Sequence, residues 1–333
     1  MMTSIVVAII LLALVFDFYN GMNDAANSIA TIVSTRVLTP LQAVAWAAFF
    51  NFAAAFFFGV NVANTIGKGI VDVNIVDNYV IFSGLVGAIL LTATATHLGL
   101  PISVSHAIIG GYGGAALFKG GIDAIVLSGY TKVLIFIFLA PILGLIIALL
   151  FSVITLWLVK DMPPRKVDKY FRKLQLVSAA IYSLSHGSND AQKTIGIITV
   201  ILFTNGLLGN TFHVPFSVVL LSHSVIALGT LVGGWKVIRT LGMRVTKLTP
   251  FGGFSAETSA GLTIIGATIF GIPVSTTHTI TGAIIGVGAT KSLSAVRWGV
   301  ARNILWAWIL TIPLSALFAM LTYELSTKIG SWL

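Results

Sequence analysis

Two stretches of this 333-residue chain repeat each other and decide how it is organised. Residues Asn20–Thr31 read NGMNDAANSIAT, and residues His186–Ile197 read HGSNDAQKTIGI. At an offset of 166 residues (186 − 20), five of the twelve positions are identical, including the Asn-Asp-Ala core. Similarity at a fixed offset is typical of an internal repeat. The chain is therefore expected to consist of two related halves.

A second pair of segments repeats in the same order. Residues Gly99–Gly114 read GLPISVSHAIIGGYGG, and residues Gly271–Gly286 read GIPVSTTHTITGAIIG. The offset is 172 (271 − 99), and seven of sixteen positions are identical. We therefore divide the chain into a first membrane repeat (1–159), a basic loop (160–173) and a second membrane repeat (174–333).

The composition identifies the class of protein. Hydrophobic residues make up 57% of the chain and charged residues 9%, with a mean hydropathy of +1.00, whereas a soluble domain carries roughly 25% charged residues. These values exclude a secreted enzyme, a disordered protein and a nucleic-acid binder. They predict an all-α polytopic membrane protein with roughly 10–12 membrane helices. The apolar segment 4–35 contains so many polar residues that we expect a broken or re-entrant helix there.

The basic residues predict the orientation. Ten of the 19 Lys and Arg residues fall in the stretches 160–173 and 236–247, and basic loops stay on the cytoplasmic side. If the second half begins in the cytoplasm and each half crosses an odd number of times, the first half begins outside. The sequence thus predicts inverted-topology repeats in the plasma membrane, with both termini outside. Secondary transporters often have this plan; the alternative is a duplicated scaffold that transports nothing.

Four of the ten acidic residues lie within apolar segments: Asp17, Asp24, Asp190 and Glu257. A carboxylate at membrane depth costs roughly 2.5–3.5 kcal/mol, and Lys193 is the one basic residue in the same surroundings. Asp24 and Asp190 occupy equivalent repeat positions among amide and hydroxyl side chains, which are oxygen ligands suited to a hard cation. The alternative is that these side chains only cap a broken helix.

The second motif predicts a binding site for an anion rather than for a cation. In each copy Gly can end one helix and Pro can open the next, which puts Ser103 and Ser105, or Ser275 and Thr277, in a first turn. A helix N-terminus offers free N–H groups and a positive dipole, which attract an anion; the alternative is an ordinary capped boundary. Cations and an anion bound together neutralise each other, as coupled symport requires. His106 and His278 either relay protons or hold neighbouring helices together.

The four motif copies resemble those of the inorganic phosphate transporter (PiT) family. GMNDAANSIAT (21–31) and GSNDAQKTIGI (187–197) are similar to its paired Asn-Asp signature, and the two Gly-Leu/Ile-Pro stretches are similar to its other repeated motif. The match extends from about residue 10 to residue 323. It implies symport of inorganic phosphate with Na⁺ or H⁺, an inverted-repeat fold and often a homodimer, with no enzyme activity and no cofactor other than the coupling ions.

By position, the resemblance assigns the motif residues to one site, within which we divide the roles. We expect phosphate to contact Asn27, Ser105, Gln192, Thr276 and Thr277. We expect sodium at Asn23, Asp24, Ser103, Asn189, Asp190 and Ser275. Glu257 is a candidate for a further cation site, although its counterpart in the first half is Leu85 (257 − 172).

We expect sodium to be the coupling ion because Asn, Ser and Thr oxygens suit a cation shell better than a proton relay. The alternatives are proton coupling and a sulfate permease of the same fold. An anion channel is disfavoured because two deep carboxylates would obstruct it. An intramembrane enzyme is disfavoured because the Ser and His residues of the duplicated capping motifs form no distinct nucleophile–base pair.

Overall fold

The chain is almost entirely helical. The computed structural model describes residues 4–329, which contain twelve α-helices, three short 3-10 helices and a single isolated bridge between Val71 and Ile125. The predicted all-α fold is therefore confirmed. The α-helices are α1 (Ser4–Ser34), α2 (Pro40–Ala53), α3 (Asn61–Lys68), α4 (Asn78–Leu98), α5 (Val104–Gly120), α6 (Leu127–Leu158), α7 (Pro164–Thr204), α8 (Phe216–Val232), α9 (Trp235–Arg244), α10 (Pro250–Ile269), α11 (Thr276–Lys291) and α12 (Trp298–Ile329), and the 3-10 helices are η1 (Ala54–Phe56), η2 (Gly121–Ala124) and η3 (Leu293–Ala295).

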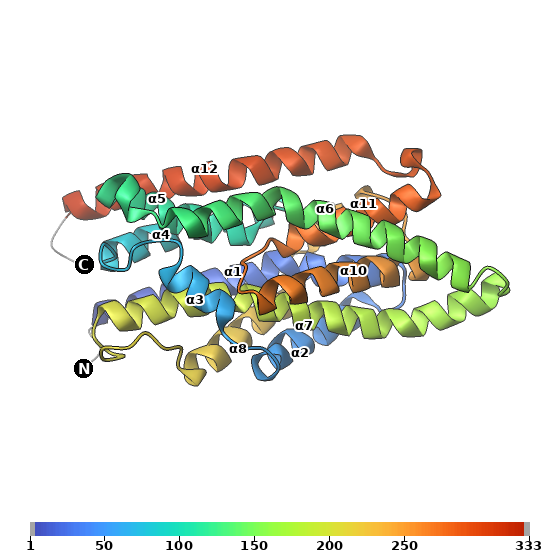
Figure 1. Ribbon diagram of the computed structural model, residues 1–333, viewed down its shortest axis with the longest axis horizontal. Helices are drawn as coiled ribbons and strands as arrows, with labels where there is room; N and C mark the ends of the chain where they lie inside the picture. The colour runs from blue at the N-terminus through green and yellow to red at the C-terminus, as the bar shows by residue number, and fades with distance from the viewer. Residues whose placement is uncertain (1–3, 330–333) are drawn as a thin grey trace.

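The two halves repeat the same helix order in opposite directions. Helices α1–α6 correspond to α7–α12: α4 and α10 begin 172 residues apart (250 − 78), and so do α5 and α11 (276 − 104). In Figure 1, α1 runs from left to right and α7 from right to left, and α6 and α12 are opposed in the same way. The helix directions are those of the predicted inverted-topology repeats.

Several helices are long enough to cross a bilayer. Helices α1, α4, α6 and α12 each pass that test alone, by length and apolar composition. Two pairs pass it together but are bent, α2–η1 with α3 by 81° and α8 with α9 by 75°. The chain is therefore a membrane protein with bent helix pairs. Twelve α-helices are described, but four to six spans pass this test within the described residues, so the number of membrane helices stays a prediction.

The expected break within 4–35 is wrong. Helix α1 is continuous over 31 residues, and α7, which carries the second Asn-Asp copy, over 41. No break is needed because the polar residues face neighbouring helices; Asp24 and Asn27 are each 1% exposed. Gly21 serves packing instead, since a β-carbon there would lie 2.1 Å from the carbonyl oxygen of Ile226 in α8.

The basic stretch 160–173 is mostly helix rather than loop. Helix α6 ends at Leu158 and α7 begins at Pro164, so only residues 159–163 join them. Proline is tolerated in a first turn because the N–H it lacks has no partner inside the helix. The basic residues from Arg165 onward lie on the largely exposed beginning of α7. In Figure 1 this connection lies at the opposite end of the molecule from the start of α1 and the end of α12.

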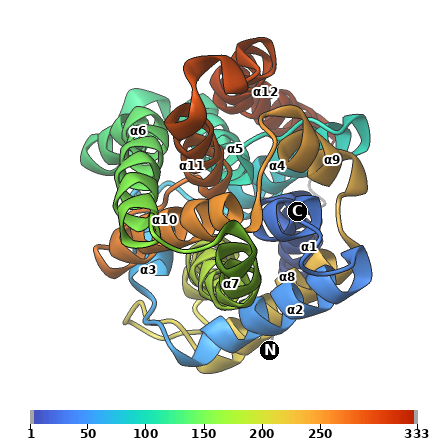
Figure 2. The ribbon, with the colours of Figure 1, turned by 90° about the vertical axis from the view of Figure 1, so that its right-hand side faces the viewer.

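The last helix of each half packs on the other half. Helix α6 lies against α10 and α11, whereas α12 lies against α4 and α5. Figure 2 shows the two groups side by side, with α1 and α7 below them and α2 and α8 at the bottom. Equivalent glycines permit both contacts. A β-carbon at Gly282 would lie 2.1 Å from the carbonyl oxygen of Pro141 in α6, and one at Gly110 would lie 2.6 Å from that of Ile312 in α12.

Candidate functional site

Helices α1 and α7 each carry a stripe of polar side chains into the centre of the molecule. The first and last members of each stripe are seven residues apart, with the aspartate between them, so the spacing places them on one helix face. All are at most 1% exposed. The α1 stripe is Asn20, Asn23, Asp24 and Asn27, and the equivalent α7 stripe, 166 residues later, is His186, Asn189, Asp190 and Lys193.

Two capped helix N-termini lie beside these stripes. The hydroxyls of Ser103 and Ser275 are the N-caps of α5 and α11, and each accepts a hydrogen bond of 3.2 Å from the N–H three residues on. Gly99 and Gly271 have φ of 74° and 66°, so they end the preceding helical segments as predicted.

The expected position of the prolines is wrong. Pro101 and Pro273 lie two residues before the caps, in the non-helical links, and not at the first helical position. Serine takes the residue before the helix because its hydroxyl can accept from a free N–H, which a proline ring cannot do. Ser103 and Ser275 are therefore occupied as caps, and neither hydroxyl bonds to an aspartate within the part of the chain that the structure describes.

The two N-termini face each other near the middle of the molecule. From there α5 and α11 extend to opposite ends, as the labels in Figure 1 indicate. Ser105 of α5 donates a hydrogen bond of 3.1 Å to the carbonyl oxygen of Val274, just before α11. The rings of His106 and His278 are 4.7 Å apart, and the His278 ring stacks on Trp308. The first turns of both helices thus bring their free N–H groups to one place.

Two threonines of α11 connect its N-terminus to the aspartates. Thr276 Oγ1 lies 3.1 Å from Asp190 and 3.4 Å from Asp24, and Thr277 Oγ1 donates to Asp24 at 3.2 Å. Asn27 Nδ2 donates to Thr277 at 2.9 Å and reaches Thr276 at 3.4 Å. The structure therefore brings together five of the predicted site residues from α1, α7 and α11.

His186 belongs to this group, although sequence reasoning did not single it out. Its Nε2 lies 3.2 Å from Asp190 and 3.8 Å from Asp24. Its Nδ1 lies 3.1 Å from Asn51 Oδ1 in α2, which holds the ring in place. These ligand atoms of Asp24, His186 and Asp190 lie within 4.8 Å of one another. The available indication was its place in the repeat, where it stands four residues before Asp190 as Asn20 does before Asp24.

The α1 stripe has oxygen atoms without donors. The Oδ1 atoms of Asn20, Asn23 and Asn27 are buried and accept no hydrogen bond from the described residues. The amide orientations of Asn23 and Asn27 follow from the network. Their Nδ2 groups donate to Thr96 and Thr277, and those hydroxyls in turn donate to the carbonyl of Thr92 and the carboxylate of Asp24. A buried acceptor without a donor costs about 1–3 kcal/mol, so these oxygens are suited to a cation.

The Asn189 and Asp190 oxygens of the α7 stripe have partners within the protein. Asn189 donates to Thr268 at 2.9 Å, as Asn23 does to Thr96, but its Oδ1 also accepts from the N–H of Val274 at 3.3 Å. Asp190 is paired with Lys193 Nζ. Two equivalent aspartates thus stand in different surroundings, one beside unpaired oxygens and one beside an ammonium group.

Gln192 does not face the aspartates. Its Oε1 accepts from the N–H groups of Val62 and Ala63 at 2.9 and 3.1 Å, and its Nε2 donates to the carbonyl of Ser188. The side chain therefore holds the N-terminus of α3, which has no side-chain cap of its own. The pattern of the Asn-Asp motif could not reveal this contact because α3 lies more than a hundred residues away in the sequence.

Glu257 forms a separate buried cluster. It accepts hydrogen bonds from Thr31 (2.6 Å), Gln175 (2.9 Å) and Ser178 (2.5 Å). Ser178 precedes Asp190 by twelve residues on α7, which is about 18 Å along the helix axis. The first half has no such cluster, since the equivalent Leu85 belongs to the apolar core.

Asp17 lies about two turns before Asp24 on α1 and bonds to other helices. Its carboxylate accepts from Thr194 of α7 at 3.0 Å and from Ser222 of α8 at 2.5 Å. These hydroxyls satisfy the buried group, so Asp17 ties α1, α7 and α8 together beside the site.

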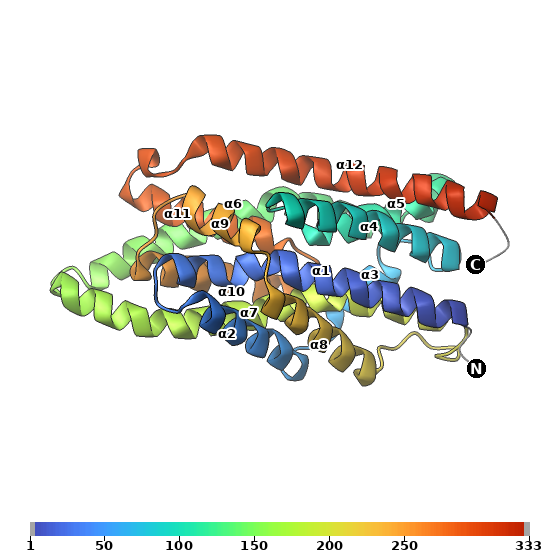
Figure 3. The same cartoon turned by 180° about the vertical axis from the view of Figure 1, so that it is seen from behind.

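The short helices α3 and α9 contact the helix ends of the opposite repeat in the same way. Thr65 donates to the carbonyl of Gly271 at 2.7 Å, and Thr240 to that of Gly99 at 3.1 Å. Asn61 and Lys236 reach the carbonyls of residues 269 and 97, at 3.0 and 2.9 Å. Comparison of Figures 1 and 3 places α3 toward the end with the termini and α9 toward the α6–α7 connection. We call these two contacts the α3 latch and the α9 latch.

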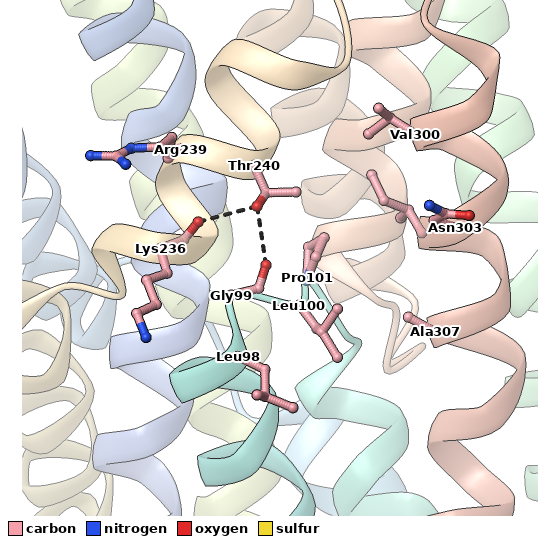
Figure 4. Close-up of a pocket in the computed structure, with 11 residues that line it drawn as sticks. Leu98, Gly99, Leu100, Pro101, Lys236, Arg239, Thr240, Val300, Asn303 and Ala307 are labelled. Carbon is pink, nitrogen blue, oxygen red and sulfur yellow. Dashed lines mark hydrogen bonds between the residues drawn. The ribbon is translucent and has the colours of Figure 1, made fainter.

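A cavity lies beside each latch. The one at the α9 latch has a volume of about 430 Å³ and is lined by Lys236, Arg239, Asn303 and Ala307 with the 98–101 link; Figure 4 shows the Thr240–Gly99 contact at its wall. The one at the α3 latch has a volume of about 170 Å³ and includes Thr65, Val126, Lys132 and the 270–273 link. Both cavities thus end at the links that lead to the facing N-termini of α5 and α11.

Comparison with known proteins agrees with this arrangement. A probable low-affinity inorganic phosphate transporter of Rhizobium meliloti (strain 1021) is 55% identical over 319 residues, 96% of each chain. One of Bacillus subtilis (strain 168) is 41% identical over 320 residues, 95% of this chain and 96% of the relative. A solved structure of a sodium-dependent phosphate transporter superposes with a TM-score of 0.88 at 28% identity, covering 98% of this chain and all of that one. The model of the phosphate transporter family matches residues 20–165 and 159–319, and the chain belongs to that family.

Proposed function

We propose that the protein is a symporter that carries inorganic phosphate across the plasma membrane together with sodium. The observation that carries this proposal is the position of Asp24. It shares the α1 stripe with three asparagine oxygens that accept no hydrogen bond from the described residues, and it contacts the N-terminal turn of α11 through Thr276 and Thr277. A cation is favoured on one side of the carboxylate and an anion on the other, so each ligand raises the affinity for the other.

The cation site of the first repeat is proposed at Asn23 and Asp24, with Ser103 contributing if its hydroxyl leaves its capping role. These are hard oxygen ligands, as sodium and similar ions prefer. The equivalent set in the second repeat is Asn189, Asp190 and Ser275, but there Lys193 already pairs with the aspartate. Glu257 remains a candidate for a further cation site, with three hydroxyl or amide groups around its carboxylate.

The phosphate site is proposed between the N-termini of α5 and α11. The free N–H groups of both first turns would bind phosphate oxygens, because helix N-termini favour anions. Asn27, Ser105, Thr276 and Thr277 would supply side-chain contacts, since all four lie at or beside these turns. Gln192 is left out of the proposal because its amide holds α3.

Transport is proposed to proceed by alternating access, with the two latches as gates. Each latch joins a short helix of one repeat to a helix end of the other, and the two lie toward opposite ends of the molecule. Opening the α9 latch would connect the site to the cavity beside Lys236 and Arg239. We propose that this side is cytoplasmic, because the basic start of α7 lies at the same end, and that the protein acts as a homodimer, as the family resemblance implies.

One observation favours proton coupling as the alternative. The imidazole of His186 lies between Asp24 and Asp190, where it could accept a proton in place of a bound sodium ion. A sulfate permease of the same fold would share the helix N-termini. The carboxylates favour phosphate because they can accept the hydrogen bond of a phosphate O–H group, which sulfate lacks.

Uptake of radiolabelled phosphate into proteoliposomes tests the proposal. The two driving forces are an inward sodium gradient and a pH gradient without sodium, and each is measured with and without excess unlabelled sulfate. Accumulation driven by sodium and unaffected by sulfate is the expected result. Accumulation driven by the pH gradient alone would identify protons, not sodium, as the coupling ions. Suppression by sulfate would indicate that the protein also binds sulfate.

A further inference from the structure

The two Asn-Asp stripes differ most at the positions that flank the aspartate. The residues four before and three after it are Asn20 and Asn27 in α1, but His186 and Lys193 in α7. Two neutral amides in one repeat are thus replaced by two basic side chains in the other. The internal repeat lets each position be compared directly with its counterpart in the same molecule.

Lys193 makes the contacts that a bound monovalent cation would make. Its ammonium group pairs with Asp190 Oδ1 and donates to the carbonyl oxygen of Val274 at 3.2 Å. The side chain is 1% exposed. A carboxylate and a backbone carbonyl at a helix N-terminus are the same oxygen groups that would coordinate sodium.

The acceptors that lack donors lie on the other stripe. The Oδ1 atoms of Asn20, Asn23 and Asn27 accept no hydrogen bond from residues 4–329, whereas Asn189 Oδ1 accepts from Val274 N–H. The unpaired buried oxygens thus lie on the same helix stripe as Asp24, while Asn189 Oδ1 and Asp190 Oδ1 have partners. Of the two stripes, the first is therefore the one whose oxygens lack partners and favour an external cation.

We propose that the Lys193 ammonium permanently occupies the cation position of the second repeat, so that transport couples to one sodium ion fewer than two equivalent aspartates would require. The inference rests on the proposed sodium coupling and deepens it. Because Lys193 is part of α7, its charge stays with the protein when the cargo leaves. When the empty transporter reorients, Asp24 is then the one member of the Asp24–Asp190 pair whose charge lacks a basic partner as close as Lys193. This lowers the free-energy cost of keeping charge buried in the membrane.

The test measures the number of sodium ions per phosphate. Proteoliposomes are given fixed sodium and phosphate gradients, the membrane potential is set with potassium and valinomycin, and the potential at which net flux of radiolabelled phosphate vanishes gives the ratio. Lys193→Asn introduces the residue of the first repeat and should raise the ratio by one sodium ion. Lys193→Arg keeps the charge and should keep the wild-type ratio.

Two further variants control for the loss of charge. Lys166→Asn removes an exposed ammonium group from the beginning of the same helix and should not alter the ratio. Asp190→Asn combined with Lys193→Asn removes both members of the ion pair and should return the ratio to that of the wild type. An unchanged ratio in an active Lys193→Asn protein overturns the inference and leaves the proposed function in place.

A binding measurement covers variants that fold but do not transport. Radioactive sodium bound at saturation is counted on purified protein that elutes as a single species in gel filtration. Lys193→Asn, or Lys193→Gln if the first variant does not fold, should bind one more sodium ion per chain than the wild type. Equal numbers would refute the proposed role of Lys193. A wild type that neither binds sodium nor responds to its gradient would instead refute the sodium coupling itself.

Discussion

Asp24 and Asp190 reach the same hydroxyl group from the two repeats: Thr276 Oγ1 lies 3.4 Å from Oδ2 of the first and 3.1 Å from Oδ2 of the second. A hydroxyl has one proton to donate, so it cannot satisfy both carboxylates at once. Asp190 also has Lys193 and, at 3.2 Å, His186 Nε2, whereas Asp24 has Thr277 and stands 3.8 Å from His186 Nε2.

Replacing Asp24 by asparagine should therefore weaken sodium coupling. We expect the apparent sodium affinity of phosphate uptake to fall about 10- to 100-fold, the effect of losing one charged hydrogen-bonding partner. The measurement is initial uptake against sodium concentration in proteoliposomes. Asp123→Asn makes the same change at an exposed position in η2 and is the matched control. Equal sodium dependence in both variants would rule out Asp24 as a ligand.

Thr276→Val should weaken the binding of phosphate and the binding of sodium together. The change removes the hydroxyl near both carboxylates and the more distant of the two acceptors of Asn27, while keeping the shape of the side chain. We expect the KM for phosphate to rise about tenfold, because a hydrogen bond to a charged group contributes about 1.5–3 kcal/mol. Thr263→Val in α10 removes a hydroxyl that bonds only to its own helix, and it should behave like the wild type.

The latches should act on opposite sides of the membrane. Because the chain contains no cysteine, a single one can be introduced at Ala307 in the α9 cavity or at Val126 in the α3 cavity. We expect Thr240→Val to speed labelling of Ala307→Cys by an impermeant maleimide, and Thr65→Val to speed labelling of Val126→Cys. If either threonine change affected both positions equally, the two contacts could not be separate gates.

Gly21→Ala should destabilise the contact between α1 and α8. A β-carbon there would overlap the carbonyl oxygen of Ile226 at 2.1 Å, and overpacking of this kind costs about 1–3 kcal/mol. The readout is the Tm of the purified protein in detergent. Gly266→Ala, a helical glycine with open space around it, is the control and should leave the Tm unchanged or raise it. A Gly21→Ala protein as stable as this control would contradict the packing argument.

Glu257 allows a test of whether its cluster binds a cation or only stabilises the fold. Glu257→Leu copies the equivalent residue of the first half and leaves Thr31, Gln175 and Ser178 without their acceptor. We expect a lower Tm, since each unpaired group costs about 1–3 kcal/mol. A bound cation would add a sodium-dependent rise in the Tm of the wild type that Glu257→Gln reduces; the same sodium response in both would assign the cluster to stability alone.

The sequence was sufficient for the repeat, the all-helical fold and most of the central cluster. Matching motifs locate Asp24, Asp190 and Thr276, and a Gly followed by a Ser locates the starts of α5 and α11. It could not show that α1 is continuous, because polar residues suit a broken helix or a stripe facing other helices equally well. Nor could it place Gln192, whose partner is the distant N-terminus of α3. A motif fixes the face on which a side chain lies, but tertiary packing chooses its partner.

Because α12 of the second half packs on α4 and α5 of the first half, the first half cannot complete its packing until the second half has been translated. Helices α4 and α5 are made early, yet their neighbour α12 begins 178 residues after α5 ends (298 − 120). At the usual pace of about 5–20 residues per second, translation of that interval takes roughly 10 to 35 s. During it, the face of α5 around Gly110 lacks the helix that packs on it in the finished protein. The packing of the first half is therefore completed only after the second half has been synthesised. A chain that ends before Trp298 lacks the helix that covers α4 and α5.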